Sequence, residues 1–161
     1  MVWEDKKDYI KVENMNSYEL CYSNFKGGHS GENIADKKRG NPVKLGIEIL
    51  SKLNYVYISS IKGGSLVNVI PRDFSVIFSC KNNDAEKIIN QEINIQKEFY
   101  GEEVNIELKR IENKSKVFSK ETTKDIINFI NNYNNGALNF DIFGNQILSA
   151  NLEQLMNLMI I

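Results

Sequence analysis

The single histidine of the chain, His29, lies in a glycine-rich stretch, Lys26-Gly27-Gly28-His29-Ser30-Gly31. Glycines accept backbone angles that other residues avoid, and they let the chain approach a ligand or a neighbouring strand closely. An imidazole on such a loop can therefore be presented to a ligand. A tight turn with a histidine that is merely polar surface is the alternative interpretation, and the loop alone does not decide between them.

The residues around this loop exclude several kinds of catalysis. The Gly-x-Ser-x-Gly nucleophile motif fails because Glu32 stands two positions after Ser30, and the sequence holds no second histidine to act as a base. Neither phosphate-binding glycine motif occurs. One histidine and two separated cysteines do not make a zinc ligand set, so we predict no metal site in this chain. What remains is a hydrogen-bond donor to a substrate carbonyl or carboxylate.

A second glycine loop repeats the pattern of the first. The motif Ser-x-x-Lys-Gly-Gly occurs at 23–28 and again at 59–64, each time at the end of an expected strand. Chance repetition in a lysine-rich chain is one explanation. The other is that both loops line one edge of a sheet and share a ligand, in which case Asn68, just beyond the second loop, would assist His29.

The segments that must position these loops alternate between strand and helix patterns. Helices are expected after Asn41-Pro42, from Ala85 to about Tyr100 with Asp84 as the cap, and after Ser119, since the residues named before each helix favour helix starts. In the second of these helices we expect four apolar side chains to point inward, Ile88, Ile89, Ile93 and Phe99. Strands are expected at 9–12, 18–25, 55–61, 74–80 and 104–108.

The order strand, helix, strand, strand, helix, strand is that of ferredoxin-like folds. We therefore predict an α+β fold with an antiparallel sheet and both helices on one face, over about residues 9–111, followed by a C-terminal helical extension over 112–161. The chain ends on the apolar run 155–161. Because an open apolar edge recruits other chains, we expect this sequence to be a piece of a longer protein.

The composition limits the kinds of partner. The 161 residues carry 20 basic and 21 acidic side chains, which gives a net charge of −1. The overall charge therefore would not attract nucleic acid or an anionic membrane. The charged N-terminus lacks a signal segment and no run reaches transmembrane length. Cys21 and Cys80 fall in expected strands and indicate a buried, reduced pair. We expect a cytoplasmic protein.

Three motifs follow one another along the chain. They are Lys26–Gly31 followed by Ile34, Arg39-Gly40-Asn41 followed by Lys44-Leu45, and Gly63-Gly64 with Leu66, Asn68 and Ile70-Pro71-Arg72. In this order they resemble the lid, or dimerisation, domain of aminoacyl-histidine dipeptidases, which belong to the zinc-dependent exopeptidases, and the resemblance begins near Tyr18.

The resemblance implies that residues 1–161 are a single lid domain without the catalytic zinc domain, which would belong to the same polypeptide and hold the zinc. In that family a lid histidine, matched by His29, steadies the oxyanion of the dipeptide substrate, and a lid asparagine, matched by Asn68, holds the substrate. The glycines that match would shape the two loops, namely Gly27, Gly28, Gly31, Gly63 and Gly64. The isolated chain is then expected to be inactive.

Two other hypotheses stay open at this point. The chain could be a free-standing ferredoxin-like module that binds a small ligand or forms dimers through a sheet edge, at 104–111 or at the tail. Alternatively it could be an independent enzyme, which would show metal-stimulated peptidase activity by itself. The lid hypothesis instead requires zinc-ligand segments on both sides of this sequence.

Overall fold

The computed structural model describes residues 9–64, 69–81, 83–133, 136–140, 146–150 and 155–159. Along the chain its elements are β1 (Tyr9–Lys11), β2 (Asn16–Ser23), β3 (Gly28–His29), α1 (Ser30–Asn33), α2 (Pro42–Ser51), β4 (Val56–Gly63), β5 (Val69–Ile70), β6 (Phe74–Cys80), α3 (Ala85–Tyr100), β7 (Asn105–Ile111), β8 (Lys116–Phe118), α4 (Lys120–Asn132), β9 (Gly136–Phe140), β10 (Gln146–Ala150) and β11 (Leu155–Met159).

Five strands form an antiparallel sheet in the order β11-β4-β6-β2-β7. Strand β2 lies inside the sheet, with Leu20 opposite Val76 on one side and opposite Leu108 on the other. The four strands β7-β2-β6-β4 and the helices α2 and α3 that connect them have the split βαβ order. The predicted α+β fold is therefore confirmed.

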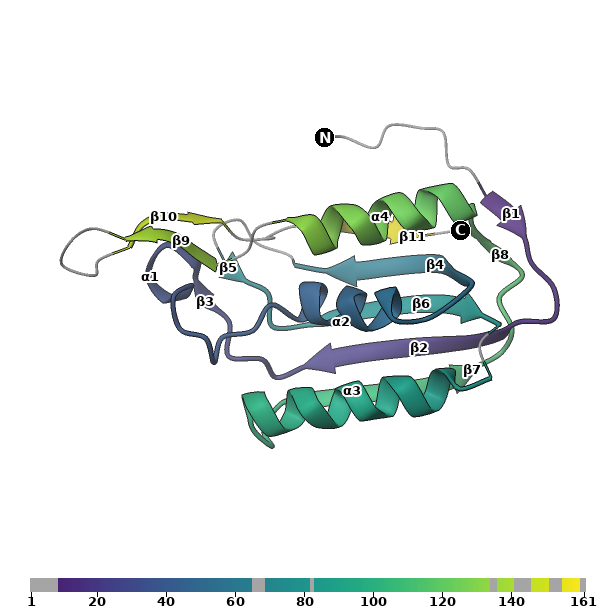
Figure 1. The fold of residues 1–161 in the computed structure, drawn as a ribbon, viewed down its shortest axis with the longest axis horizontal. Coiled ribbons are helices and arrows are strands. Elements are labelled where there is room, and N and C mark those ends of the chain that lie inside the picture. The colour runs from purple at the N-terminus through teal and green to yellow at the C-terminus, as the bar shows by residue number, and fades with distance from the viewer. Residues whose placement is uncertain are drawn as a thin grey trace.

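Helices α2 and α3 cover one face of the sheet, and α4 lies beside α2 near the β4 side (Figure 1). Alternate residues of the central strands point toward these helices, as the period of two requires. Tyr18, Leu20 and Tyr22 of β2 are nearly inaccessible to solvent. They form one core with apolar side chains of α2, α3 and α4.

Local signals explain where the helices begin and end. The Asn41 side chain accepts a hydrogen bond from the Val43 amide at 3.0 Å, and Ser119 Oγ accepts one from the Thr122 amide at 3.1 Å. Helix α3 ends at Gly101, whose φ of 107° suits glycine. Asp84 precedes α3 as expected, but its side chain makes no capping hydrogen bond.

Two side chains differ from the sequence-based expectations. Phe99 is 45% exposed, because the inward face of α3 continues from Ile93 to Gln96 and leaves Phe99 on the outer side. Cys80 is buried, but Cys21 is only half-buried, because its side chain points to the face of the sheet opposite the core. Burial nevertheless raises the pKa of the Cys21 thiol.

The extension beyond residue 112 also holds more than the expected helix. It contains α4 and, in addition, strand β8, the pair β9–β10 and strand β11. The apolar run 155–159 forms β11, which pairs with β4 through Leu155 opposite Gly63 and Leu158 opposite Ile61. The run therefore belongs to the main sheet, where it covers part of the β4 edge.

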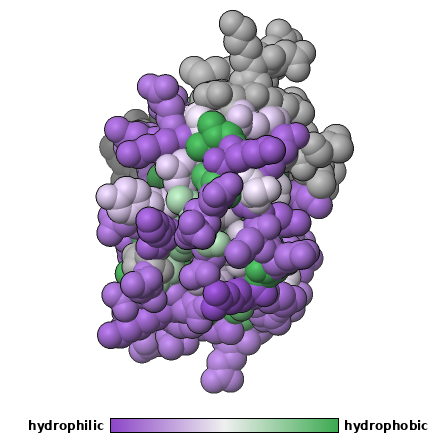
Figure 2. Space-filling view, turned by 90° about the vertical axis from the view of Figure 1, so that its right-hand side faces the viewer, coloured by the Kyte–Doolittle hydropathy of each residue, from purple (hydrophilic) through white to green (hydrophobic). Residues whose placement is uncertain are grey.

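The end of the molecule that carries β1 and β8 is mostly hydrophilic, with hydrophobic residues scattered over it (Figure 2). Scattered apolar side chains are normal for a protein surface and do not indicate a docking site. Among the helices that the structure describes, none has the length and apolar character needed to cross a membrane.

Candidate functional site

The first glycine loop is paired with a later segment of the chain through a short antiparallel ladder. Strand β3 pairs with β5, with Gly28 opposite Ile70 and His29 opposite Val69. Strand β5 lies beyond the second loop in sequence, so segments about 40 residues apart in the chain lie side by side at one end of the sheet (Figure 1). That the two glycine loops share a ligand stays a prediction.

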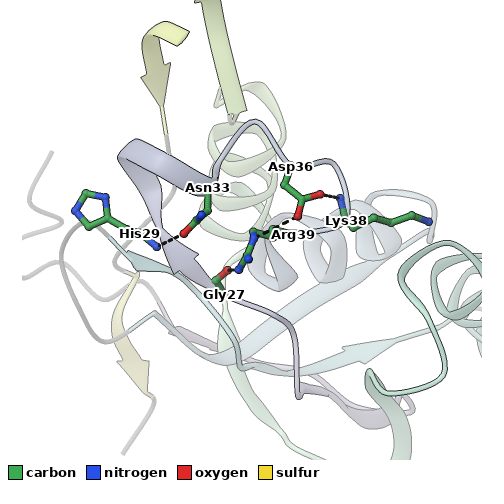
Figure 3. Close-up of polar contacts among 6 residues, drawn as sticks. All are labelled: Gly27, His29, Asn33, Asp36, Lys38 and Arg39. Carbon is green, nitrogen blue, oxygen red and sulfur yellow. Dashed lines mark hydrogen bonds and ion pairs between the residues drawn. The ribbon is translucent and has the colours of Figure 1, made fainter. Parts of the chain in front are cut away.

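His29 is exposed, and its imidazole points away from the polar cluster that holds its backbone (Figure 3). Gly27 has a φ of 60° and Gly28 a φ of 130°, angles that residues other than glycine rarely adopt. A Cβ atom on Gly28 would come within 2.7 Å of Asn33 Oδ1 and 2.9 Å of Arg39 Nη1. These glycines are required both for the backbone angles and for the close approach of polar groups.

Side chains of the segment that follows the loop bind its backbone. The His29 amide donates to Asn33 Oδ1 at 3.0 Å, and Arg39 Nη1 donates to the Gly27 carbonyl oxygen at 2.6 Å. Arg39 Nε lies 3.3 Å from Asp36 Oδ2 in an ion pair, while Asp36 Oδ1 accepts from the Lys38 amide at 2.9 Å. Figure 3 shows these contacts converging on the loop.

A second arginine fixes the start of the loop. Arg72 Nε donates to the Phe25 carbonyl oxygen at 3.0 Å, and the Phe25 amide donates to the Arg72 carbonyl oxygen at 3.3 Å. The Phe25 ring is buried and lies 5.5 Å from the Tyr100 ring, measured between centroids. The loop therefore leaves the core from a rigid position.

The other predicted site residues are placed as follows. Gly63 ends β4, and a Cβ there would come within 2.9 Å of Phe74 and Val43, so this glycine permits close packing. Gly64 has a φ of 65°, which suits a turn. Gly31 lies within the single turn α1. Asn68 lies outside the described residues.

Sequence reasoning assigned no role to Arg39, Asp36, Asn33 or Arg72. One signal could have marked the two arginines, since only three of the 20 basic residues are arginine and two of these three hold the loop. Lysine cannot replace arginine where a planar, forked donor must contact two groups at once. An arginine kept in a lysine-rich chain is thus a sign of such geometry.

The arrangement can supply one hydrogen-bonding imidazole at a fixed position. In the described part of the chain, no group of three or more His, Cys, Asp or Glu side chains could hold a metal ion. An imidazole on a well-held loop can donate or accept a proton or a hydrogen bond at a ligand brought to it from another surface. Fold and site together define a ferredoxin-like α+β domain that presents a histidine.

Residues 23–107 match the family model described as the peptidase dimerisation domain, and the chain therefore belongs to this family, which is found in M20 peptidases. The match begins at the last residue of β2, ends within β7 and includes the loop with His29. A search of curated proteins found no match.

The structure is similar to aminoacylhistidine dipeptidase from Vibrio alginolyticus, with a TM-score of 0.78 and 22% sequence identity. The similarity covers 91% of this chain and 32% of that one, so the chain spans about a third of the length of the solved protein. At this identity the similarity concerns the fold. More distant similarities include an amidase of the hydantoinase/carbamoylase family from Burkholderia multivorans, with a TM-score of 0.45, 13% identity and coverage of 70% of this chain and 31% of that one.

Proposed function

We propose that this chain is the lid domain of a zinc-dependent dipeptidase that hydrolyses Xaa-His and other dipeptides, and that His29 contacts the substrate. The observation that carries the proposal is an exposed imidazole on a loop whose backbone is fixed by Asn33 and Arg39. Membership of the peptidase dimerisation domain family supports it, as does the fold shared with an aminoacylhistidine dipeptidase.

In this proposal, His29 acts as a hydrogen-bond donor. Zinc in a separate catalytic domain of the same polypeptide would polarise the scissile carbonyl and activate water. When the lid closes, the His29 imidazole donates to the carbonyl oxygen as negative charge develops on it. A preorganised donor acts without reorganisation at the moment of reaction, which is why a fixed loop serves this role better than a mobile one.

The proposal also covers the remaining parts of the site and the chain. Asn68 is the expected second contact to the dipeptide. The whole chain forms one lid domain, which is supported by β11 of the extension joining the main sheet. The isolated chain is inactive because it lacks the catalytic domain, and the complete protein works in the cytoplasm.

We further propose that the domain forms a homodimer through the β7 edge of the sheet. Strand β11 covers part of the β4 edge, whereas β7 ends the strand order on the other side. Next to β7, the outer surface of α3 exposes Ile95 and Phe99. An edge that no other strand of the described residues covers, beside exposed apolar side chains, fits pairing with a second copy.

The test of the catalytic proposal uses the complete gene product and the 161-residue chain side by side. Dipeptide hydrolysis and bound zinc are measured for both, and for His29→Ala in the complete protein. We expect the variant to lower kcat by about 100- to 1,000-fold, as loss of one oxyanion donor does, with unchanged zinc content.

Lys37→Ala is the matched control, since Lys37 is an exposed residue of the same connecting segment. It should leave kcat close to the unmodified value. An equal kcat for His29→Ala and the unmodified enzyme would reject the role of His29, and peptidase activity of the 161-residue chain alone would reject the lid assignment.

A further inference from the structure

The two peptide units on either side of Gly28 are each held by one side chain. The Gly27–Gly28 unit is held through its carbonyl oxygen by Arg39 Nη1, and the Gly28–His29 unit through its amide by Asn33 Oδ1. A peptide unit is planar, so fixing one polar atom of each unit restricts both dihedral angles of Gly28. These angles set the direction in which the chain carries His29.

We infer that Arg39 is a positioning residue, which fixes the Gly27 carbonyl so that the loop holds His29 in one orientation, and that Asp36 in turn orients Arg39. The consequence for catalysis rests on the proposed function, but the positioning itself does not. A guanidinium is a planar fork, so Nη1 can contact Gly27 while Nε stays 3.3 Å from Asp36 Oδ2.

The segment that carries Asp36 and Arg39 is itself attached to the end of α3. Lys38 Nζ donates to the Phe99 carbonyl oxygen and lies 4.0 Å from the centroid of the Phe99 ring. Gly40 packs so closely against Tyr100 that a Cβ there would come within 2.6 Å of the ring. The support of the loop therefore extends to a long helix of the core, which gives Arg39 a firm base.

Flexible glycines make such support necessary. Gly27 and Gly28 together can adopt many conformations, and their actual angles lie in regions that a free chain populates only part of the time. Without the hydrogen bond from Arg39, the loop would exchange among these conformations. His29 would then spend less time in the orientation seen in Figure 3.

The positioning role can be measured without any substrate. His29 is the single histidine, so its imidazole resonances in an NMR spectrum of the 161-residue chain belong to one residue. In Arg39→Lys and in Arg39→Ala, we expect hydrogen exchange of the Gly28 and His29 amides to become about 10- to 100-fold faster, because a charged hydrogen bond is lost. The imidazole resonances should shift and sharpen as the side chain averages over more orientations.

One control and one further test variant make this result specific. Arg110→Lys is the control. Arg110 lies on strand β7, and its Nη2 donates to Asn16 Oδ1 of β2 at 2.7 Å. This substitution should leave the exchange of the Gly28 and His29 amides unaffected. Asp36→Asn removes the ion pair while keeping the fold, and it should give a smaller effect of the same kind. Exchange within about twofold of the unmodified chain in both Arg39 variants and in Asp36→Asn would overturn the inference. Faster exchange spread evenly over β2 and α2 would also overturn it, because Arg39 would then support the fold in general.

In the complete enzyme, Arg39→Ala should lower kcat about 10- to 100-fold with little change in KM, since a misplaced catalytic group costs about this much. In a His29→Ala background the same substitution should have no further effect on kcat. If His29→Ala alone leaves kcat unchanged, the proposed function fails, whereas the exchange measurement still decides whether Arg39 positions the loop.

Discussion

Tyr22 is a polar side chain that the core accepts because its hydroxyl has a partner. The residue is 2% exposed, and its hydroxyl donates to Gln96 Oε1 at 3.0 Å. The same glutamine donates through Nε2 to the Leu45 carbonyl oxygen at 3.4 Å, which connects β2, α3 and α2. Burial raises the pKa of the Tyr22 hydroxyl far above its ordinary value, so the folded state accepts only the neutral form.

Tyr22→Phe should therefore change how stability depends on alkaline pH. An unfolded tyrosine ionises near pH 10, whereas Tyr22 in the folded state keeps its proton well above that. The folded state of the unmodified chain thus loses stability as pH rises through about 10. Urea unfolding from pH 7 to 11 should show a shallower loss for Tyr22→Phe, although Tyr18 and Tyr100, whose pKa values burial also raises, keep some loss in both proteins.

At pH 7 the variant should be less stable by about 1 kcal/mol, because Gln96 Oε1 loses its donor. Below pH 9, tyrosines stay protonated in both the folded and the unfolded state. The free energies of unfolding of the two proteins should therefore depend on pH in the same way there. Curves that stay parallel up to pH 11 would contradict the argument from burial.

Helix α2 depends on one glycine for its close approach to the sheet. The helix begins with Asn41 as cap and Pro42 in its first turn, and Val43, Ile47 and Leu50 face the core. At Gly46 a Cβ atom would come within 2.3 Å of Phe74 Cε1 and 3.1 Å of Tyr22 Cε2. Both rings are buried, so neither can move aside without disturbing other contacts.

Gly46→Ala has two opposing effects on stability: the added Cβ overlaps with the two rings, whereas alanine has a better helix propensity than glycine. The propensity gain is at most about 1 kcal/mol, whereas overpacking a core typically costs about 1–3 kcal/mol. We expect a net loss of stability, measured as a lower urea midpoint and a lower Tm. Glu48→Ala, at an exposed position of the same helix, is the control and should change the midpoint little. A stabilised Gly46→Ala protein would show that α2 can shift away from the sheet.

The two edges of the main sheet differ from each other. Strand β4 is partly covered by β11, while β7 carries exposed Glu107 and Lys109 on one face. The hydrogen bond that Glu107 accepts from Asn105 Nδ2, together with the ion pair to Lys109 at 3.1 Å, lowers the pKa of Glu107, and the same ion pair raises the pKa of Lys109. If two copies paired antiparallel about Leu108, Glu107 of each would lie opposite Lys109 of the other, which is a favourable cross-strand pair.

The proposed homodimer predicts that Ile95→Glu weakens self-association. Ile95 is 59% exposed on α3, so a charge there should leave the fold intact but disturb an apolar contact between copies. Sedimentation over a range of protein concentrations should show a dimer Kd raised about tenfold or more.

Phe129→Glu is the matched control, since Phe129 is an exposed apolar residue of α4, the helix that lies near β4 and away from β7 (Figure 1). It should leave the Kd unchanged. An unmodified chain that stays monomeric at high concentration would reject the homodimer, and equal effects of the two substitutions would reject the β7 edge as its location.

The sequence alone predicted the features that depend on neighbours along the chain. Apolar alternation marked the strands, and Asn41, Ser119 and Gly101 marked helix ends, because capping and backbone angles involve only a few adjacent residues. The order of these elements was enough to predict the ferredoxin-like sheet. The glycines around His29 marked the loop as the place to look for function.

Only the tertiary structure decided how that loop is held. Arg39 reaches Gly27, Lys38 reaches Phe99 and the apolar tail joins β4, although nothing in local periodicity distinguishes these residues from similar ones nearby. Such contacts arise because folding brings distant segments together and leaves each polar backbone group to find a partner there. The sequence could place a histidine on a flexible loop, but it took the packed fold to make that loop rigid.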